Sequence, residues 1–257
     1  MEISFSHVRI IAEKEISEHK LRFLLVFICI PILSGLFFIP HIFVNTAFLE
    51  DLQIEARYLL YDPGIRRQLI LVDLQLPIYV LIPAFATPFF GILESIIGEK
   101  DARTMEALFL LPVSRWTVLF GKIVPSVLFA IVLSWFSFVY HFTLFLIFTD
   151  KILALHLISW EWFIILILLI PGTVYMTSIT AVYISMRVKK LQTAVNLSAL
   201  ILAPVFLLIT AIGLGYIRIG TLFLTEGAVL ILVIGIFMTM FVYRRFSVEK
   251  LILEMYD

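Results

Sequence analysis

The stretch "IIGEKDARTMEALFLLPVSR", residues 96–115, is a charged segment between two long apolar runs, and it indicates where one run ends and the next begins. Its charged side chains are Glu99, Lys100, Asp101, Arg103, Glu106 and Arg115. Charged groups are costly inside a bilayer, so a segment this polar is expected outside the hydrocarbon region. The stretch therefore predicts a loop that connects two membrane spans.

The composition of the whole chain places it among membrane proteins. Of its 257 residues 62% are hydrophobic and only 15% are charged, which is outside the range of soluble domains. The first 22 residues are rich in Glu and Lys, and the apolar run from Phe23 lacks an Ala-x-Ala ending, so we expect a retained span, not a signal peptide. A single cysteine, Cys29, excludes an intramolecular disulfide.

Six apolar segments are long enough to cross a bilayer, which takes about 20 residues. We place them at residues 23–44, 76–97, 123–148, 162–186, 194–216 and 227–243. The third would be about 39 Å long at 1.5 Å per residue, so it must tilt, bend or protrude. The predicted fold is thus all-α, a polytopic protein of six transmembrane helices that form a single domain over residues 1–257.

The cationic side chains indicate the orientation of the chain. With six spans, fourteen of the nineteen Lys and Arg residues fall in the segments on the side of the termini, and five fall on the other side. Because Lys and Arg are enriched in cytoplasmic loops, both termini are predicted to be cytoplasmic, in the plasma membrane. The net charge of zero gives no indication of a nucleic-acid partner.

Two further segments are predicted to lie at the membrane surfaces. Residues 1–22 carry an apolar stripe, Phe5, Val8, Ala12 and Ile16, and are expected to form a helix along the inner interface, with a solvated tail as the alternative. Residues 45–75 form the long outer loop, in which an amphipathic helix is followed by an Asp-Pro-Gly turn. That helix would either cap a vestibule or lie among the headgroups.

Two sequence patterns within the spans suggest how the helices pack. Pro77, Pro83 and Pro88 crowd the second span, which is therefore expected to bend, either as a gate or within a static bundle. In the fourth span a small-residue stripe favours close helix packing over a substrate path. The stripe consists of Thr173, Thr177, Ala181 and Ser185.

Ionisable groups inside spans are the usual candidates for function. Glu94, one turn from the inner end of the second span, is predicted to serve in a gate or to pair with Lys100 or Arg103, and the structural pair is favoured. His141 is interpreted as a packing histidine in preference to a proton relay or ligand. No phosphate-binding loop, metal-ligand motif or catalytic motif occurs, so we expect no enzyme activity, catalytic residue or metal site in this chain alone.

The charged loop itself has the pattern of a short amphipathic helix. Within residues 98–117, Ala102, Met105 and Leu108 alternate with charged residues at helical spacing, and Pro112 would end the helix. Apolar side chains beside a mixed-charge face, held close to the membrane, suit docking into a groove of a soluble partner.

The segment "GEKDARTMEALFLLPVSRWTVLFGK" resembles the type-2 ABC transporter permeases, six-span subunits that work with separate ATP-binding subunits. The matching positions are Glu99, Lys100, Thr104, Glu106, Leu108, Pro112, Ser114, Arg115, Gly121 and Lys122. Asp101, Ala102 and Arg103 depart from the family pattern. The segments "RIIAEKEISEHKLRFLL" and "YRRFSVEKLI" are also similar to the interfacial helix and the closing tail of the family.

The resemblance implies an exporter in which residues 98–117 form a coupling helix seated on an ATP-binding cassette subunit. The coupling residues would be Glu99, Lys100, Asp101, Arg103, Thr104, Glu106, Leu108, Pro112 and Arg115. ATP and Mg²⁺ would be bound by that partner, and a second permease subunit, giving a homodimer, would complete the path within the membrane lipid. The alternative is an ion-coupled secondary transporter or channel that works alone.

Overall fold

The computed structural model describes residues 5–43, 62–102, 104, 114–148, 158–188, 190–197, 203, 207 and 221–245. The elements in chain order are α1 (Phe5–Phe43), α2 (Pro63–Asp101), α4 (Arg115–Phe148), α6 (Trp160–Ile164), η3 (Ile165–Leu169), α7 (Ile170–Arg187) and α9 (Thr221–Arg245). Every regular element in these ranges is helical, which confirms the predicted all-α class.

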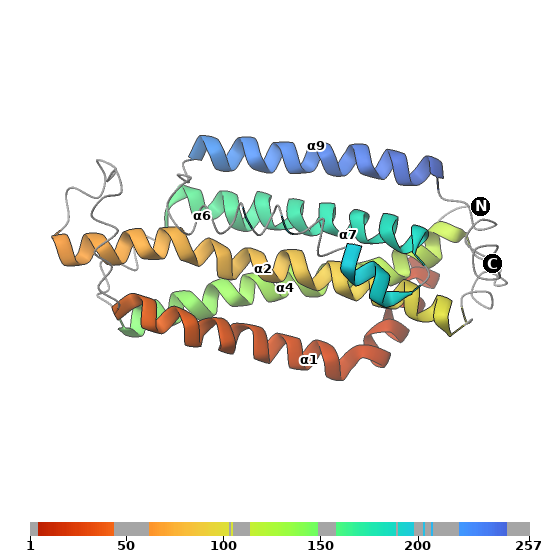
Figure 1. The fold of residues 1–257 in the computed structure, drawn as a ribbon, viewed down its shortest axis with the longest axis horizontal. Coiled ribbons are helices and arrows are strands. Elements are labelled where there is room, and N and C mark those ends of the chain that lie inside the picture. Colours follow the sequence, from red (N-terminus) through yellow and green to blue (C-terminus); the bar gives the residue numbers. More distant parts are fainter. Residues whose placement is uncertain are drawn as a thin grey trace.

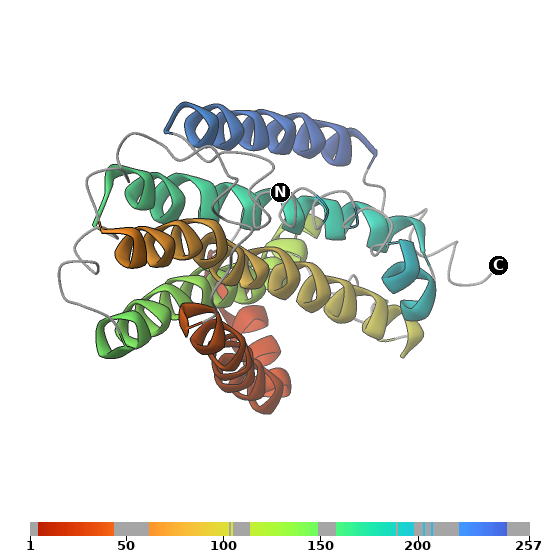
Figure 2. The same cartoon turned by 60° about the vertical axis from the view of Figure 1, so that its left-hand side comes forward.

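The long helices lie side by side in an elongated bundle (Figure 1, Figure 2). α2 packs against α4 on one side and α7 on the other, α1 packs mainly on α4, and α9 packs on α7. α1 and α9 therefore form opposite edges of the bundle, and α2 lies at its centre.

Within the described residues, four helices are long and apolar enough to cross a membrane: Leu76–Asp101, Trp116–Phe148, Trp160–Arg187 and Leu222–Arg244. α1 adds a fifth if its two parts are counted together, because Phe5–Leu21 and Phe23–Leu36 meet at a bend of 55°. This bend coincides with the predicted boundary between the interfacial helix and the first span. Most of the remaining predicted span, 194–216, lies outside the described residues.

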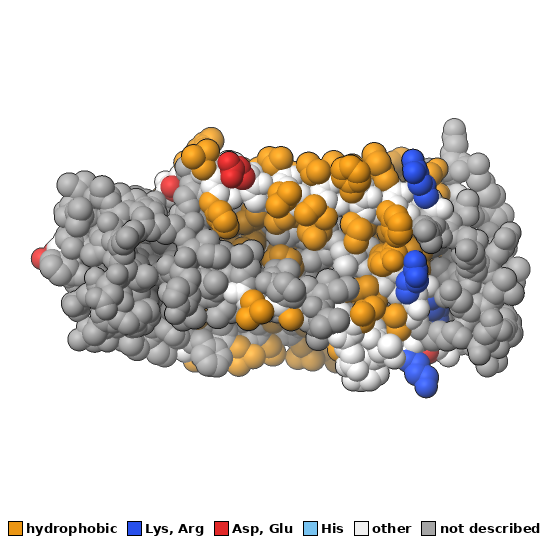
Figure 3. Space-filling model, turned by 45° about the horizontal axis from the view of Figure 1, so that its top comes forward, with side chains coloured by type: hydrophobic (Ala, Val, Ile, Leu, Met, Phe, Trp, Pro, Cys, Tyr) orange, Lys and Arg blue, Asp and Glu red, His pale blue; other side chains and the backbone are white. Residues whose placement is uncertain are grey.

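The outer surface of the bundle is apolar along most of its length. Figure 3 shows hydrophobic side chains over the described part of one face, with Lys and Arg gathered toward one end. Exposed cations end or follow the helices at that end, namely Arg187, Lys190 and Arg244. An apolar band bordered by cations fits a chain that crosses the bilayer several times.

The second span begins earlier than the sequence pattern suggested. Pro63 is the first residue of α2 and Asp62, with φ −58° and ψ 145°, stands in the position before it. Proline is favourable at the first position of a helix, because its missing N–H has no helical partner to lose there. The Asp-Pro-Gly motif therefore starts a helix, and the prediction of a turn there was wrong. Residues 63–75 extend α2, while residues 45–61 lie outside the described part.

The two packing patterns behave differently in the structure. α2 continues as one helix through Pro77, Pro83 and Pro88. The small-residue stripe of α7 is buried, and its hydroxyls at Thr173, Thr177 and Ser185 donate to carbonyls of their own helix. This is the arrangement expected for close helix packing.

The helix that contains α6 and α7 is interrupted by η3, a π-helical turn. There the indole Nε1 of Trp135 in α4 donates to the Leu166 carbonyl at 3.0 Å.

Candidate functional site

A buried lysine near the start of α4 joins three helices. Lys122 is 1% exposed, and its Nζ lies 2.7 Å from Glu15 Oε1 of α1 and 2.8 Å from Glu99 Oε2 of α2. It also donates to the carbonyl and to the hydroxyl of Ser95, each at 3.2 Å. Lysine is almost never fully buried unless it is paired. The three helices are therefore held together by one ammonium group.

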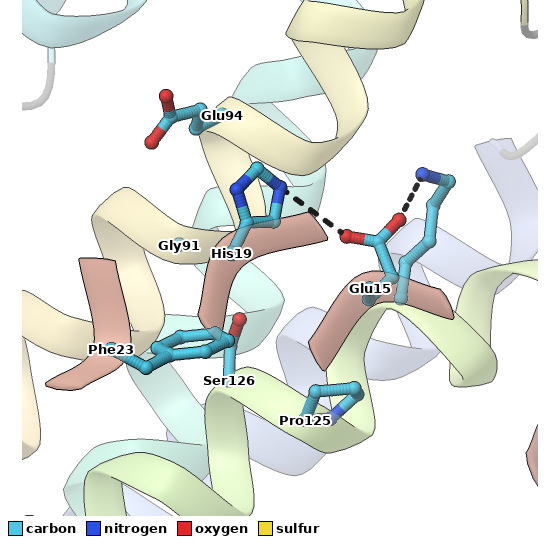
Figure 4. A pocket seen from close by; sticks show the side chains of 8 residues that line it. Glu15, His19, Phe23, Gly91, Glu94, Pro125 and Ser126 are labelled. Carbon is cyan, nitrogen blue, oxygen red and sulfur yellow. Dashed lines mark hydrogen bonds and ion pairs between the residues drawn. The ribbon is translucent and has the colours of Figure 1, made fainter. Parts of the chain in front are cut away.

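The carboxylates around Lys122 are also nearly enclosed. Glu15 is buried, and its second oxygen, Oε2, accepts a 2.9 Å hydrogen bond from Ser95 Oγ and lies 3.8 Å from His19 Nε2 (Figure 4). The Glu99 side chain is 14% exposed. Its contact with Lys122 is an ion pair without hydrogen-bond geometry.

A second cation balances the network from its rim. Lys14 Nζ lies 3.8 Å from Glu99 Oε1 and 3.5 Å from Glu18 Oε1, and its side chain is half exposed. Glu99 thus lies between Lys122 inside and Lys14 at the rim, and Glu15 pairs with Lys122. Two charges of each sign in a partly enclosed site keep the buried carboxylates from being left unpaired, which would be costly.

Gly121 allows the N-terminal part of α1 to approach α4 closely. A Cβ added at Gly121 would lie 2.6 Å from the Cβ of Ile11 and 3.3 Å from the carbonyl oxygen of Val8. Ile11 is buried at this contact. The two adjacent residues therefore hold α1 against α4 in different ways. Gly121 permits the close contact with Ile11, and Lys122 pairs with Glu15.

Replacing Gly121 by alanine is expected to lower the free energy of unfolding by about 1–3 kcal/mol, because the helices must separate to admit the methyl group. Heat or denaturant unfolding of the full chain in detergent micelles measures the change. Gly98→Ala is the matched control, since its added Cβ meets nothing within 4 Å. That control should be neutral or stabilising by up to about 1 kcal/mol. Equal losses in both variants would contradict the close contact with Ile11.

Lys100 connects the end of α2 to the end of α7. It is buried, and its Nζ donates to the carbonyl of Ser185 at 2.6 Å. The last carbonyls of a helix lack helical partners and interact favourably with cations. This contact caps α7 and ties it to the start of the charged segment.

The structure divides the predicted coupling residues into two groups. Glu99 and Lys100 face inward to the contacts above, whereas Asp101 and Thr104 are exposed. Ser114 Oγ accepts the backbone N–H of Thr117 at 3.2 Å and so caps the start of α4. Arg103, Glu106, Leu108 and Pro112 lie outside the described residues, and the side chain of Arg115 is not among those described. Their predicted role stays a prediction.

Two other predicted candidates, Glu94 and His141, lie apart from the charged segment. Glu94 lines a hollow beside the network, together with Glu15 and Lys122. His141 is buried, its Nδ1 donates to the carbonyl of Ser137 at 2.7 Å, and its ring stacks on Tyr79 with centroids 5.1 Å apart. These contacts agree with the interpretation of His141 as a packing histidine. Among the residues that the structure describes, no group of three or more His, Cys, Asp and Glu could hold a metal ion.

Sequence reasoning missed Glu15 and Ser95. The predicted apolar stripe of residues 1–22 is only partly packed on the bundle: Phe5 is 85% exposed and Ile16 is exposed, whereas Val8 and Ala12 are half-buried. The most buried positions are Ile11 and Glu15, four residues apart. An interfacial helix has lipid on one side and protein on another, so its apolar stripe can be the lipid side. The spacing of Ile11 and Glu15, which places them on one face of the helix, was the sequence feature that could have indicated a buried Glu15.

Comparison with known proteins gives one match. A family model described as "ABC-2 family transporter protein" matches residues 9–248. No curated protein and no solved structure matches. The matched range contains the whole buried network, from Glu15 to Lys122.

Proposed function

Because the chain belongs to the ABC-2 family of transporters, we propose that it is the permease subunit of an exporter driven by ATP that a separate subunit hydrolyses. The family implies association with an ATP-binding cassette subunit. ATP and Mg²⁺ are then bound by that partner, and this chain supplies the membrane path and no catalytic residue of its own.

The observation that carries the proposal is the attachment of both ends of the charged segment to other helices. Glu99 Oε2, near the start of the segment, lies 2.8 Å from Nζ of Lys122, just after its end, and Lys122 also pairs with Glu15 of α1. Lys100 adds the end of α7. A partner that displaces residues 98–117 therefore acts on α1, α2, α4 and α7 together, as coupling to a moving ATPase requires.

The inward and outward residues suggest a division of tasks within the segment. Glu99 and Lys100 hold its base against the bundle, while exposed Asp101 and Thr104 are available to the partner. We infer that Arg103, Glu106, Leu108, Pro112 and Arg115 complete the surface that meets the ATP-binding subunit.

The remaining parts of the proposal concern assembly and orientation. Both termini lie in the cytoplasm, the chain is in the plasma membrane, and the part of α1 before the 55° bend lies along the inner interface. A second copy of the chain lines the transport path. Exposed apolar residues of α1 and α9 then contact lipid or the second copy, because apolar surface of this extent is not left to water.

Purification of the tagged full chain from its native membranes tests the proposal. The expected result is a stoichiometric complex with a subunit that carries a Gly-x-x-x-x-Gly-Lys-Ser/Thr loop, and transport in reconstituted vesicles that requires Mg²⁺ and ATP. Transport by the purified chain alone, driven by an ion gradient, would overturn the proposal in favour of a secondary transporter.

A further inference from the structure

Aromatic rings from three helices meet at the end of the bundle that carries the exposed cations. The Tyr183 ring of α7 lies 5.7 Å from the Phe241 ring of α9. The Trp116 ring of α4 stacks on the Tyr243 ring of α9, with centroids 5.1 Å apart. Tyr243 is 64% exposed. Because tryptophan and tyrosine are enriched where a membrane meets water, these rings mark the level of the lipid headgroups at this end of the bundle.

Three exposed cations follow these rings along the chain: Arg187, Lys190 and Arg244. Cζ of Arg187 lies 5.3 Å from the centre of the Tyr183 ring, and Arg244 directly follows Tyr243. Lys and Arg side chains gather at this end of the apolar face (Figure 3). In the part of the chain that the structure describes, none of the three cations pairs with a carboxylate. Their charge is therefore available to a ligand.

The end of α7 is capped by Lys100, which leaves Arg187 for another role. Cations near the end of a helix often interact with its last carbonyls. Here the carbonyl of Ser185 accepts its hydrogen bond from Lys100 Nζ, and the Arg187 guanidinium lies over the Tyr183 ring instead. A guanidinium stacked on a ring keeps N–H donors at its edge, and its planar fork matches two phosphate oxygens. Arg187 is thus placed to bind a phosphate group without leaving the ring.

The face of α9 that leads to these rings is apolar. Residues 227–243 contain no charged side chain, and Phe237 and Met240 are 70% and 57% exposed. Phe237 lies one turn before Phe241, and Met240 one turn before Tyr243. A phospholipid matches both features, since its acyl chains fit the apolar face and its phosphate fits the cations at the end of that face. An acidic soluble protein would contact the cations and leave the apolar face uncovered, so the arrangement favours a lipid.

We propose that Arg187, Lys190 and Arg244, together with the rings of Tyr183 and Tyr243, form a surface that binds the headgroup of an anionic phospholipid. The cations offset the negative charge of the phosphodiester, and Arg187 donates to its oxygens. A zwitterionic lipid brings a positive group to the same cations, so the surface selects lipids by charge. The inference does not rest on the proposed function, because it concerns contacts of the chain alone with its membrane.

Native mass spectrometry of the full chain in detergent, titrated with short-chain phosphatidylglycerol and the matching phosphatidylcholine, tests this inference. We expect phosphatidylglycerol to bind about tenfold more tightly, because each cation near an anionic headgroup contributes favourably. Excess inorganic phosphate should not displace it, since a free ion lacks the acyl chains that contact α9. Equal binding of the two lipids, or displacement by inorganic phosphate, would overturn the assignment.

Variants locate the binding. The double variant Arg187→Gln with Arg244→Gln should bind phosphatidylglycerol about tenfold more weakly. The matched control is Arg9→Gln with Lys20→Gln, which removes the same charge from exposed positions on α1, at the opposite edge of the bundle. Unfolding temperatures verify that both variants stay folded. Unchanged binding in the first variant, or equal weakening in both, would show that no specific site exists.

The same titration of the chain in complex with an ATP-binding subunit tests the other class of occupant. We expect phosphatidylglycerol to bind the complex as it binds the chain alone. If assembly of the complex removed that binding, the cations would belong to a protein interface and the lipid assignment would be wrong.

Discussion

Replacing Lys122 by methionine is expected to lower the free energy of unfolding by about 3–5 kcal/mol, the usual cost of breaking a buried ion pair from one side. Methionine keeps most of the packing of the lysine stem and removes the charge. Glu15 and Glu99 would then lie without Lys122 in a nearly enclosed site, with Lys14 at the rim. The N-terminal part of α1 should detach, and its accessibility to added protease should increase.

Two comparisons separate this effect from a general loss of charge. Lys14→Met removes the same group from a half-exposed position and should cost no more than about 1 kcal/mol. Combining Lys122→Met with Glu15→Gln and Glu99→Gln removes the unpaired carboxylates and should recover part of the loss. Unfolding of each purified chain in detergent supplies the values. A Lys122 variant as stable as the Lys14 variant would show that the network does not hold α1.

Replacing Glu99 and Arg103 together by alanine is expected to abolish ATP-driven transport and to leave membrane insertion intact. Glu99 links the segment to Lys122, and Arg103 belongs to the surface proposed to meet the partner. Lys122 keeps Glu15 and Ser95 in this variant, so the stability loss should be smaller than for Lys122→Met. Transport and Mg-ATPase activity in reconstituted complexes are the measurements.

The matched control for this variant removes the same two residue types elsewhere. Arg9 and Glu13 form a highly exposed pair on α1, with Arg9 Nε 2.7 Å from Glu13 Oε1. Their double replacement by alanine should leave transport unchanged, since exposed pairs of this kind contribute little. If the Glu99 and Arg103 variant hydrolysed ATP and transported as the unmodified complex does, the coupling assignment would be wrong.

The membrane architecture was predictable because it depends on local composition. Apolar runs of sufficient length identify the spans regardless of their neighbours, and the described helices follow four to five of them. The start of α2 was not predictable from Asp62, Pro63 and Gly64 alone, because these residues serve both turns and helix starts.

The site was only half predictable for a different reason. Lys122, Gly121 and Glu99 stand in a recognisable motif, but their partners Glu15 and Ile11 come from a distant segment. In sequence, Glu15 has the pattern of an ordinary charged residue on a surface helix. Its burial follows from tertiary contacts with Ser95 and Lys122, which no periodicity in residues 1–22 encodes.

The separation of Glu15 from Lys122 also sets an order for biogenesis. The two residues are 107 positions apart, so the carboxylate leaves the ribosome long before its ammonium partner. At about 5–20 residues per second, the wait is roughly 5–20 seconds. During that time the first helix must be sheltered by the membrane surface or the insertion machinery, and its docking marks the arrival of the third predicted span.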